Sequence, residues 1–197
     1  MTTDRKSIIE SVTSGVASAV RGVGDVAQAV LDAVTDTLVS ALKGVRAITN
    51  ETLGLIFDTV SASIKGVSQV GGDLTAAARS AVLGVVRGTR DVATGTLEAV
   101  STSAEAAVKT VGDVGGDVGG AAKGAVEGAI QGAKEVGLSA EDAAAAAATG
   151  ALKGAGQIST TAVEQVRNVL AGTISGVKVV VKEPFKGEVE AEPADKE

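Results

Sequence analysis

The chain has 197 residues, a formal net charge of −6 and 26 Gly, and its only aromatic residues are two Phe. It contains no His, Cys, Trp or Tyr, which excludes disulfides, thiolate chemistry and metal sites built on His or Cys. With 45% hydrophobic residues the chain is too apolar for plain disorder, although it lacks the aromatic side chains that fill most cores. Val, Ala, Leu and Ile must therefore form its apolar surfaces.

The ends and the charge indicate where the protein acts. Residues 1–6 lack the order of a signal peptide, and no 18-residue stretch is apolar and uncharged throughout. Net negative charge argues against nucleic acid as the main partner. We therefore expect a cytoplasmic protein, with a peripheral position at a membrane or granule as the alternative, and no simple transmembrane span.

The first predicted element is a helix that follows an N-terminal tail of residues 1–6. Ser7 and Glu10 have the spacing of a capping box, which predicts a helix start at Ser7. From there apolar residues recur every eleven positions, beginning with the series from Ile9 and from Val12. The predicted apolar face comprises Val12, Val23, Leu31, Val34, Leu42, Val45, Leu53, Ile56, Ile64, Val67, Leu152, Val163, Val166, Ile174 and Val177.

This period predicts the fold class. Eleven residues in three turns is close to the natural helical repeat and gives a nearly straight or slightly right-handed stripe. Five of the eleven positions are mainly apolar, and between Ile8 and Val181 they hold a single charge, Glu141. We therefore predict an all-α protein whose repeat region, residues 7–183, is one very long amphipathic helix that assembles as a coiled coil.

Small residues add a second period of 22 residues. At each step one small residue precedes another by four positions, as in Ala62/Gly66 and Ala106/Thr110. Gly inside a helix costs about 0.5–1 kcal/mol relative to Ala, but small pairs let two helix backbones approach closely. The predicted helix–helix flank comprises Gly22, Gly44, Gly66, Gly84, Gly88, Gly128, Gly132, Gly150, Gly154, Gly172 and Gly176.

Further along the chain, Gly-rich segments predict hinges. The weakest helix is expected at 112–120, a break with Ser139 as N-cap is expected at 137–139, and Gly71-Gly72 is a lesser hinge. The break would place Glu141 in a first turn rather than on the apolar face. Because loops seldom preserve a register, the unbroken register favours a continuous helix over hairpins. Pro184 is expected to end the helix, and residues 184–197 to form a disordered charged tail.

No motif predicts catalysis. The carboxylates recur periodically on the polar face, which is typical of a solvated surface, and no phosphate-binding or dinucleotide motif is complete. We expect no enzyme activity, no catalytic or metal-binding residues and no cofactor.

The 11- and 22-residue units resemble those of hendecad coiled coils and of the lipid-coating apolipoproteins, perilipins and synucleins. Units such as Val20-Arg21-Gly22-Val23 and Ile64-Lys65-Gly66-Val67 are similar to the Lys-x-Gly-Val repeats of synucleins. The resemblance covers residues 8–181 in period and composition, and it implies an amphipathic helix at a lipid surface or in a coiled coil. Apolipoproteins place Pro between units, whereas this repeat has none.

The sequence favours the first of three functions, and the other two are its alternatives. The first is a structural homo-oligomer, in which helices pack side by side into a bundle, barrel or sheet with an apolar inner face, with lipid as a further partner. The second is an amphipathic coat of lipid droplets, storage granules or membranes, as formed by phasins and perilipins. The third is a desiccation or stress protectant.

Overall fold

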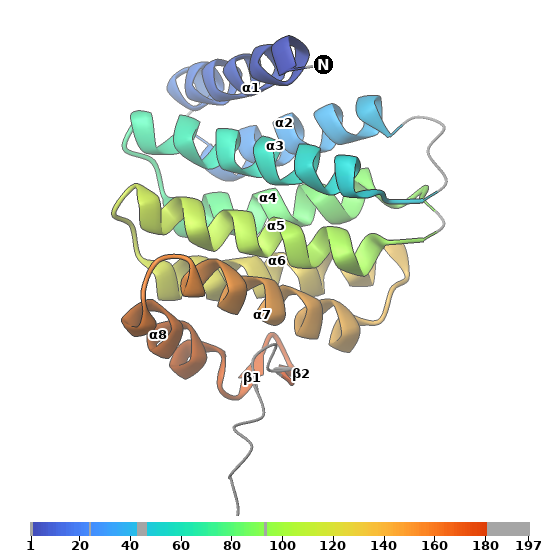
Figure 1. The fold of residues 1–197 in the computed structure, drawn as a ribbon, viewed down its shortest axis with the longest axis vertical. Coiled ribbons are helices and arrows are strands. Elements are labelled where there is room, and N and C mark those ends of the chain that lie inside the picture. Colours follow the sequence, from blue (N-terminus) through green and yellow to red (C-terminus); the bar gives the residue numbers. More distant parts are fainter. Residues whose placement is uncertain (1, 24, 43–46, 93, 181–197) are drawn as a thin grey trace, which may run out of the picture.

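The computed structural model describes residues 2–23, 25–42, 47–92 and 94–180, and over these residues the chain forms eight helices and one short hairpin (Figure 1). The predicted all-α class is confirmed, but the single very long helix is wrong. The helices are α1 (Thr2–Val23), α2 (Val26–Ala41), α3 (Asn50–Gln69), α4 (Leu74–Gly88), α5 (Thr96–Asp113), α6 (Val118–Val136), α7 (Ala140–Gly156) and α8 (Thr160–Leu170), and the strands are β1 (Thr173–Ile174) and β2 (Val177–Lys178).

The helices stack in two layers. Helices α1, α3, α5 and α7 form one layer, and α2, α4 and α6 lie behind them, with α8 at the C-terminal end (Figure 1). Successive helices from α1 to α7 run in opposite directions, so helices within one layer run in the same direction (Figure 1). Every helix makes its most extensive contact with a helix two positions away in the chain. The fold is therefore a stack of repeated units whose principal interfaces join alternate helices.

The 22-residue period corresponds to one helix plus one connection. The N-caps of α4, α5, α6 and α7 are Asp73, Gly95, Asp117 and Ser139, each 22 residues after the one before. When every unit has the same length, equivalent residues recur at the same spacing along the sequence, even if each unit contains a loop. This explains why an unbroken register accompanies eight separate helices.

Two connections share the sequence Val-Gly-Gly-Asp, at residues 70–73 and 114–117. In both, the first Gly has a positive φ, 69° at Gly71 and 77° at Gly115, where side chains other than Gly are strained. The amide of the second Gly donates to a carbonyl of the last helical turn, Gly72 to Val67 (3.1 Å) and Gly116 to Val111 (2.8 Å). The segment thus ends one helix and supplies Asp as the N-cap of the next.

Asp73 shows how the next helix begins. Its Oδ1 accepts the amide hydrogens of Thr75 and Ala76 at 2.8 and 3.1 Å, so two otherwise unpaired donors of the first turn are satisfied. The predicted break at 137–139 is confirmed in the same terms. Ser139 caps α7 by accepting from the Asp142 amide, and Glu141 lies in the first turn.

The predicted ends of the helical region need correction. Helix α1 begins at Thr2, so Ser7 lies inside it and does not cap it. The last helix ends at Leu170, and an antiparallel hairpin follows, with Thr173 opposite Lys178. The predicted helix end at Pro184 and the tail 184–197 lie outside the described residues.

The core lies between the two layers. It is formed by aliphatic side chains such as Val34, Ile56, Ile64 and Ile130, each at most 1% exposed, with Ala dominating in the C-terminal half. In α7 the buried side chains are almost all Ala. Such small side chains bring neighbouring helices close together, which makes the positions of the Gly residues critical.

Candidate functional site

The small-residue pairs lie where alternate helices meet within one chain. A Cβ atom added to Gly66 of α3 would lie 2.7 Å from the carbonyl oxygen of Thr13 in α1. Likewise, a Cβ on Gly88 of α4 would lie 2.8 Å from the Cβ of Leu38 in α2. Both distances are shorter than real side chains tolerate, so the absence of a side chain at these positions permits the observed packing.

The contacts tighten towards the C-terminus. Added Cβ atoms on Gly128 and Gly150 would overlap the backbone carbonyl groups of Arg79 and Ser101, respectively. An added Cβ on Gly154 would lie 2.5 Å from the Glu105 carbonyl oxygen. Gly84 and Gly132 pack in the same way on Val34 and Val86, at 3.0 and 2.7 Å. Small residues thus join helices side by side, and in this structure both helices of each pair belong to one chain.

Two of the predicted flank glycines, Gly172 and Gly176, are placed differently, and the contacts of Gly22 and Gly44 are not among those described. Gly22 lies in α1, and Gly44 lies outside the described residues. Gly172 and Gly176 precede and interrupt the hairpin with φ values of 126° and 81°, and no atom lies near enough to meet an added Cβ. Their assignment to a helix–helix contact is therefore wrong, because the helical repeat ends at Leu170.

The predicted apolar face points into the stack. Its buried helical members are Val12, Leu31, Val34, Ile56, Ile64, Val67, Leu152 and Val166, and Leu53 and Val163 are half-buried. Leu42, the C-cap of α2, is buried as well. Ile174 and Val177 are also buried, but they belong to the hairpin. Val23 lies at the end of α1, and Val45 lies outside the described residues. The apolar stripe thus forms the interior of the chain's own two-layer stack.

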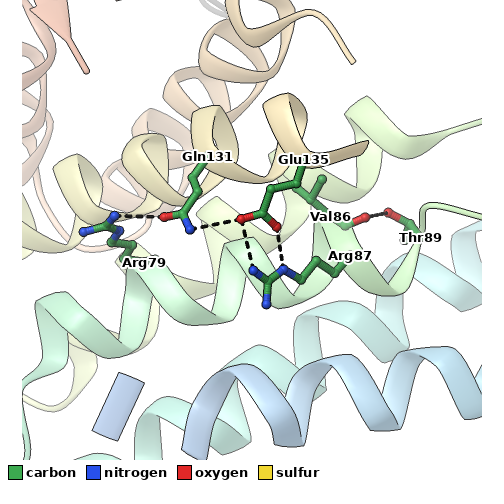
Figure 2. Close-up of polar contacts among 6 residues, drawn as sticks. All are labelled: Arg79, Val86, Arg87, Thr89, Gln131 and Glu135. Atoms are coloured by element: carbon green, nitrogen blue, oxygen red, sulfur yellow. Dashed lines mark hydrogen bonds and ion pairs between the residues drawn. The ribbon is translucent and has the colours of Figure 1, made fainter. Parts of the chain in front are cut away.

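A polar ladder crosses the surface between α4 and α6 (Figure 2). Arg87 donates through Nε and Nη2 to both carboxylate oxygens of Glu135, at 2.6 and 3.0 Å. Gln131 donates to Glu135 at 3.1 Å and accepts from Arg79 at 2.8 Å. No local sequence signal predicts this ladder, because its partners lie 48 and 52 residues apart and are brought together only by the packing of alternate helices.

The hydrogen bonds of the ladder change the pKa values of Arg87 and Glu135. The hydrogen bond from Arg87 lowers the pKa of the Glu135 carboxyl, partial burial opposes this, and the Gln131 amide lowers it further. The same bond raises the pKa of Arg87. Both side chains are 35% exposed, so solvent screens the pair and its contribution to stability is small.

Replacing Glu135 with Gln is expected to lower the free energy of unfolding by at most about 1 kcal/mol near pH 7. The folded-state pKa of Glu135 lies below its unfolded value of about 4.3. The carboxylate therefore contributes its full stability above that value and loses it as the pH falls through the folded pKa. Urea unfolding of both proteins at neutral and acidic pH checks this, and a difference that stays constant as the carboxyl protonates would contradict it.

The two ends of the stack differ in their coverage. Within the described residues no helix covers the outer face of α1, where Ser7, Ser11, Ser14 and Ser18 are exposed and nothing lies within 4 Å of an added Cβ on Gly15. At the other end, α8 and the hairpin cover α6 and α7. The exposed positions of α8 include Thr161, Glu164, Gln165 and Asn168. A polar cap thus closes the C-terminal end, whereas the N-terminal end exposes a strip of small residues beside Lys6, Glu10 and Arg21.

Comparisons with protein-family models, curated protein sequences and solved structures return no match to this chain. Within the part of the chain that the structure describes, no helix is both long and apolar enough to cross a membrane. The same residues contain no cluster of three or more potential metal-ligating side chains. What the chain does must therefore be inferred from its own surfaces.

Proposed function

We propose that this chain is a non-enzymatic structural protein whose helical stacks self-associate through the uncovered outer face of α1. The observation that carries the proposal is that the small pair of α1 occupies the same repeat position as the small pair through which α3 packs on α1. In α3 the pair Ala62/Gly66 belongs to the interface with α1, and Gly66 packs directly on it. The pair one full turn of the stack earlier is Ser18/Gly22 in α1, where Ser18 is exposed and no helix of the described residues packs on that face.

The partner that best fits this face is a second copy. The exposed small residues of α1 are arranged symmetrically about the point between Ser14 and Gly15, so an antiparallel α1 from another copy would place Ser11 opposite Ser18. A two-fold interface requires this kind of self-complementarity. Repeat stacks normally end in polar caps. The exposed charges of α1, Lys6, Glu10 and Arg21, lie to one side of its outer face, whereas Ser and Gly form the rest of that face and favour the close approach of another helix. The joined copies would form a side-by-side array with hendecad-spaced apolar faces inside.

Burial of the apolar face favours assembly over a lipid coat. A coat needs the aliphatic stripe to face lipid, whereas residues such as Val34 and Ile64 are fully buried between the layers. Lipid binding through this stripe would require the two layers to separate. Lipid coating therefore becomes an outcome that the following experiment distinguishes.

The test is sedimentation velocity with circular dichroism, with and without anionic lipid vesicles. We expect a helical dimer in plain buffer that becomes monomeric when Ser14 and Ser18 are both replaced with Lys, because like charges would then face each other across the two-fold axis. Thr161→Lys on exposed α8 is the matched control and should remain dimeric. A wild-type monomer that gains helix only with vesicles would overturn the proposal, as would a dimer that the double replacement leaves intact.

A further inference from the structure

A predominantly apolar groove of about 490 Å³ lies between α5, α7 and the end of β2. Its lining includes Leu97 and Ser101 of α5 and Ala145, Ala146 and Thr149 of α7. This volume falls in the range of pockets that bind ligands or side chains. The groove belongs to the C-terminal end of the stack and is separate from the outer face of α1.

Two exposed hydrophobic side chains mark the groove as incompletely covered. Leu97 is 38% exposed and Val180 is 57% exposed, and both line it. Val180 is also the last described residue, so the chain leaves the described structure at the edge of the groove. Uncovered apolar surface is therefore within reach of a segment attached at Val180.

The rim of the groove is acidic on one side. Glu141 and Asp142, both exposed in the first turn of α7, line it, and Lys178 of β2 lines it as well. Two carboxylates beside an apolar floor favour an occupant that combines an apolar side chain with nearby positive charge.

The sequence that continues from Val180 has this composition. Residues 181–186 read Val-Lys-Glu-Pro-Phe-Lys and contain Phe185, one of only two aromatic residues in the chain. Lys182 lies three residues before Phe185 and Lys186 follows it directly, so the two lysines outnumber the one carboxylate of the segment, Glu183. Five residues of extended chain span up to about 17 Å, so the Phe185 side chain is within reach of the whole groove.

We propose that the chain's own segment 181–186 occupies this groove, with Phe185 on the Ala145–Ala146 floor and Lys182 and Lys186 near Glu141 and Asp142. Burying the Phe ring removes both its own apolar surface and that of Leu97 from water. Attachment through Val180 gives the segment a high effective concentration at the groove. The segment would then complete the C-terminal cap that α8 and the hairpin begin.

Phe185→Trp supplies a direct reporter, since the chain has no other Trp and no Tyr. In the full-length chain we expect a blue-shifted Trp emission and protection from acrylamide. Adding Ala146→Arg, which fills the groove from its half-buried floor, should shift the emission to the red and raise the quenching constant several-fold. Val39→Arg on α2, at a side chain that is 48% exposed, is the matched control and should leave both unchanged. Equal quenching of the reporter with and without Ala146→Arg would overturn the proposal.

Sedimentation of the same proteins tests whether a second copy of the chain, rather than the segment 181–186, occupies the groove. If the segment fills it, Ala146→Arg leaves the oligomeric state of the full-length chain unchanged. If Ala146→Arg dissociates an oligomer while the Trp emission stays that of an exposed side chain, a second copy occupies the groove and the proposal is wrong. Because Ser14 and Ser18 lie on the other end of the stack, failure here is separable from failure of the proposed self-association.

Discussion

Replacing Gly150 with Ala is expected to lower the free energy of unfolding by about 1–3 kcal/mol, the usual range for overpacking. The new Cβ would overlap the carbonyl oxygen of Ser101 and lie 2.7 Å from its carbonyl carbon. The obstructing atoms are backbone, so they cannot rotate away as a flexible side chain could. Helices α5 and α7 would have to separate along their shared interface. The same replacement on an open helix surface stabilises by up to about 1 kcal/mol, so here steric overlap reverses the sign.

Gly156, in the same helix, provides the matched control. It is exposed, and the nearest atom to an added Cβ is the Val163 Cγ2 at 3.9 Å, which is ordinary van der Waals contact. Gly156→Ala should leave the stability unchanged or raise it by up to about 1 kcal/mol. Guanidinium unfolding followed by helical circular dichroism compares the two variants with the parent. A Gly150→Ala protein as stable as the Gly156→Ala protein would show that α5 and α7 are not in close contact.

How far the sequence predicts this fold is clearest from the small pairs and from Ser139. Pairs such as Gly150/Gly154 need a close helix neighbour to offset their unfavourable helix propensity. The sequence alone therefore predicts that some helix packs closely on this flank. The position of Ser139 as N-cap follows from its capping pattern and from Glu141, a charge that would otherwise fall on the apolar face of the eleven-residue repeat. Both inferences rest on local chemistry. Each signal lies within one helix turn of the residue it describes.

The predicted continuous helix is wrong because a constant register does not require one. A loop disturbs a register only when its length varies between units, and the N-caps Asp73, Asp117 and Ser139 occur at multiples of 22 residues. The repeated Val-Gly-Gly-Asp segment carried the information that was needed, because a left-handed Gly followed by an N-cap Asp ends one helix and begins the next. The sequence analysis predicts only a hinge at Gly71-Gly72 and a weak helix at 112–120, where the structure has two complete connections.

The partners across the stack could not be predicted from the sequence. Arg87 pairs with Glu135, and Thr110 donates to Ser61 at 2.9 Å, across separations of 48 and 49 residues. A helical wheel places each of these side chains on a polar or small flank, but it does not say which helix lies beside that flank. The neighbouring helix is determined by the alternation of the two layers, and the apolar period does not predict that alternation. The groove beside Val180 depends on the same arrangement.

Removing residues 74–117 is expected to give a shorter folded stack. The deletion joins Asp73 to Val118, so Asp73 takes the place of Asp117 as N-cap and the Val-Gly-Gly-Asp connection is preserved. Helix α6 then occupies the position of α4, with Gly128 and Gly132 at the same distances from the N-cap as Gly84 and Gly88. In near-additive repeat stacks, loss of two of the eight helices described should lower the free energy of unfolding by roughly a quarter. Chemical unfolding and the ellipticity per residue measure the effect.

Removing only residues 74–95 should instead abolish cooperative unfolding. This deletion of one 22-residue unit places α5 in the position of α4, so Ala106 and Thr110 meet α2 where Gly84 and Gly88 were. Added Cβ atoms at those two sites lie only 3.0 Å and 2.8 Å from the Cβ atoms of Val34 and Leu38, and α8 would cap the wrong layer. The larger deletion is therefore expected to be the better tolerated of the two. If both shortened chains unfold with the same cooperativity, the repeating unit is a single helix rather than a pair, and the two layers are interchangeable.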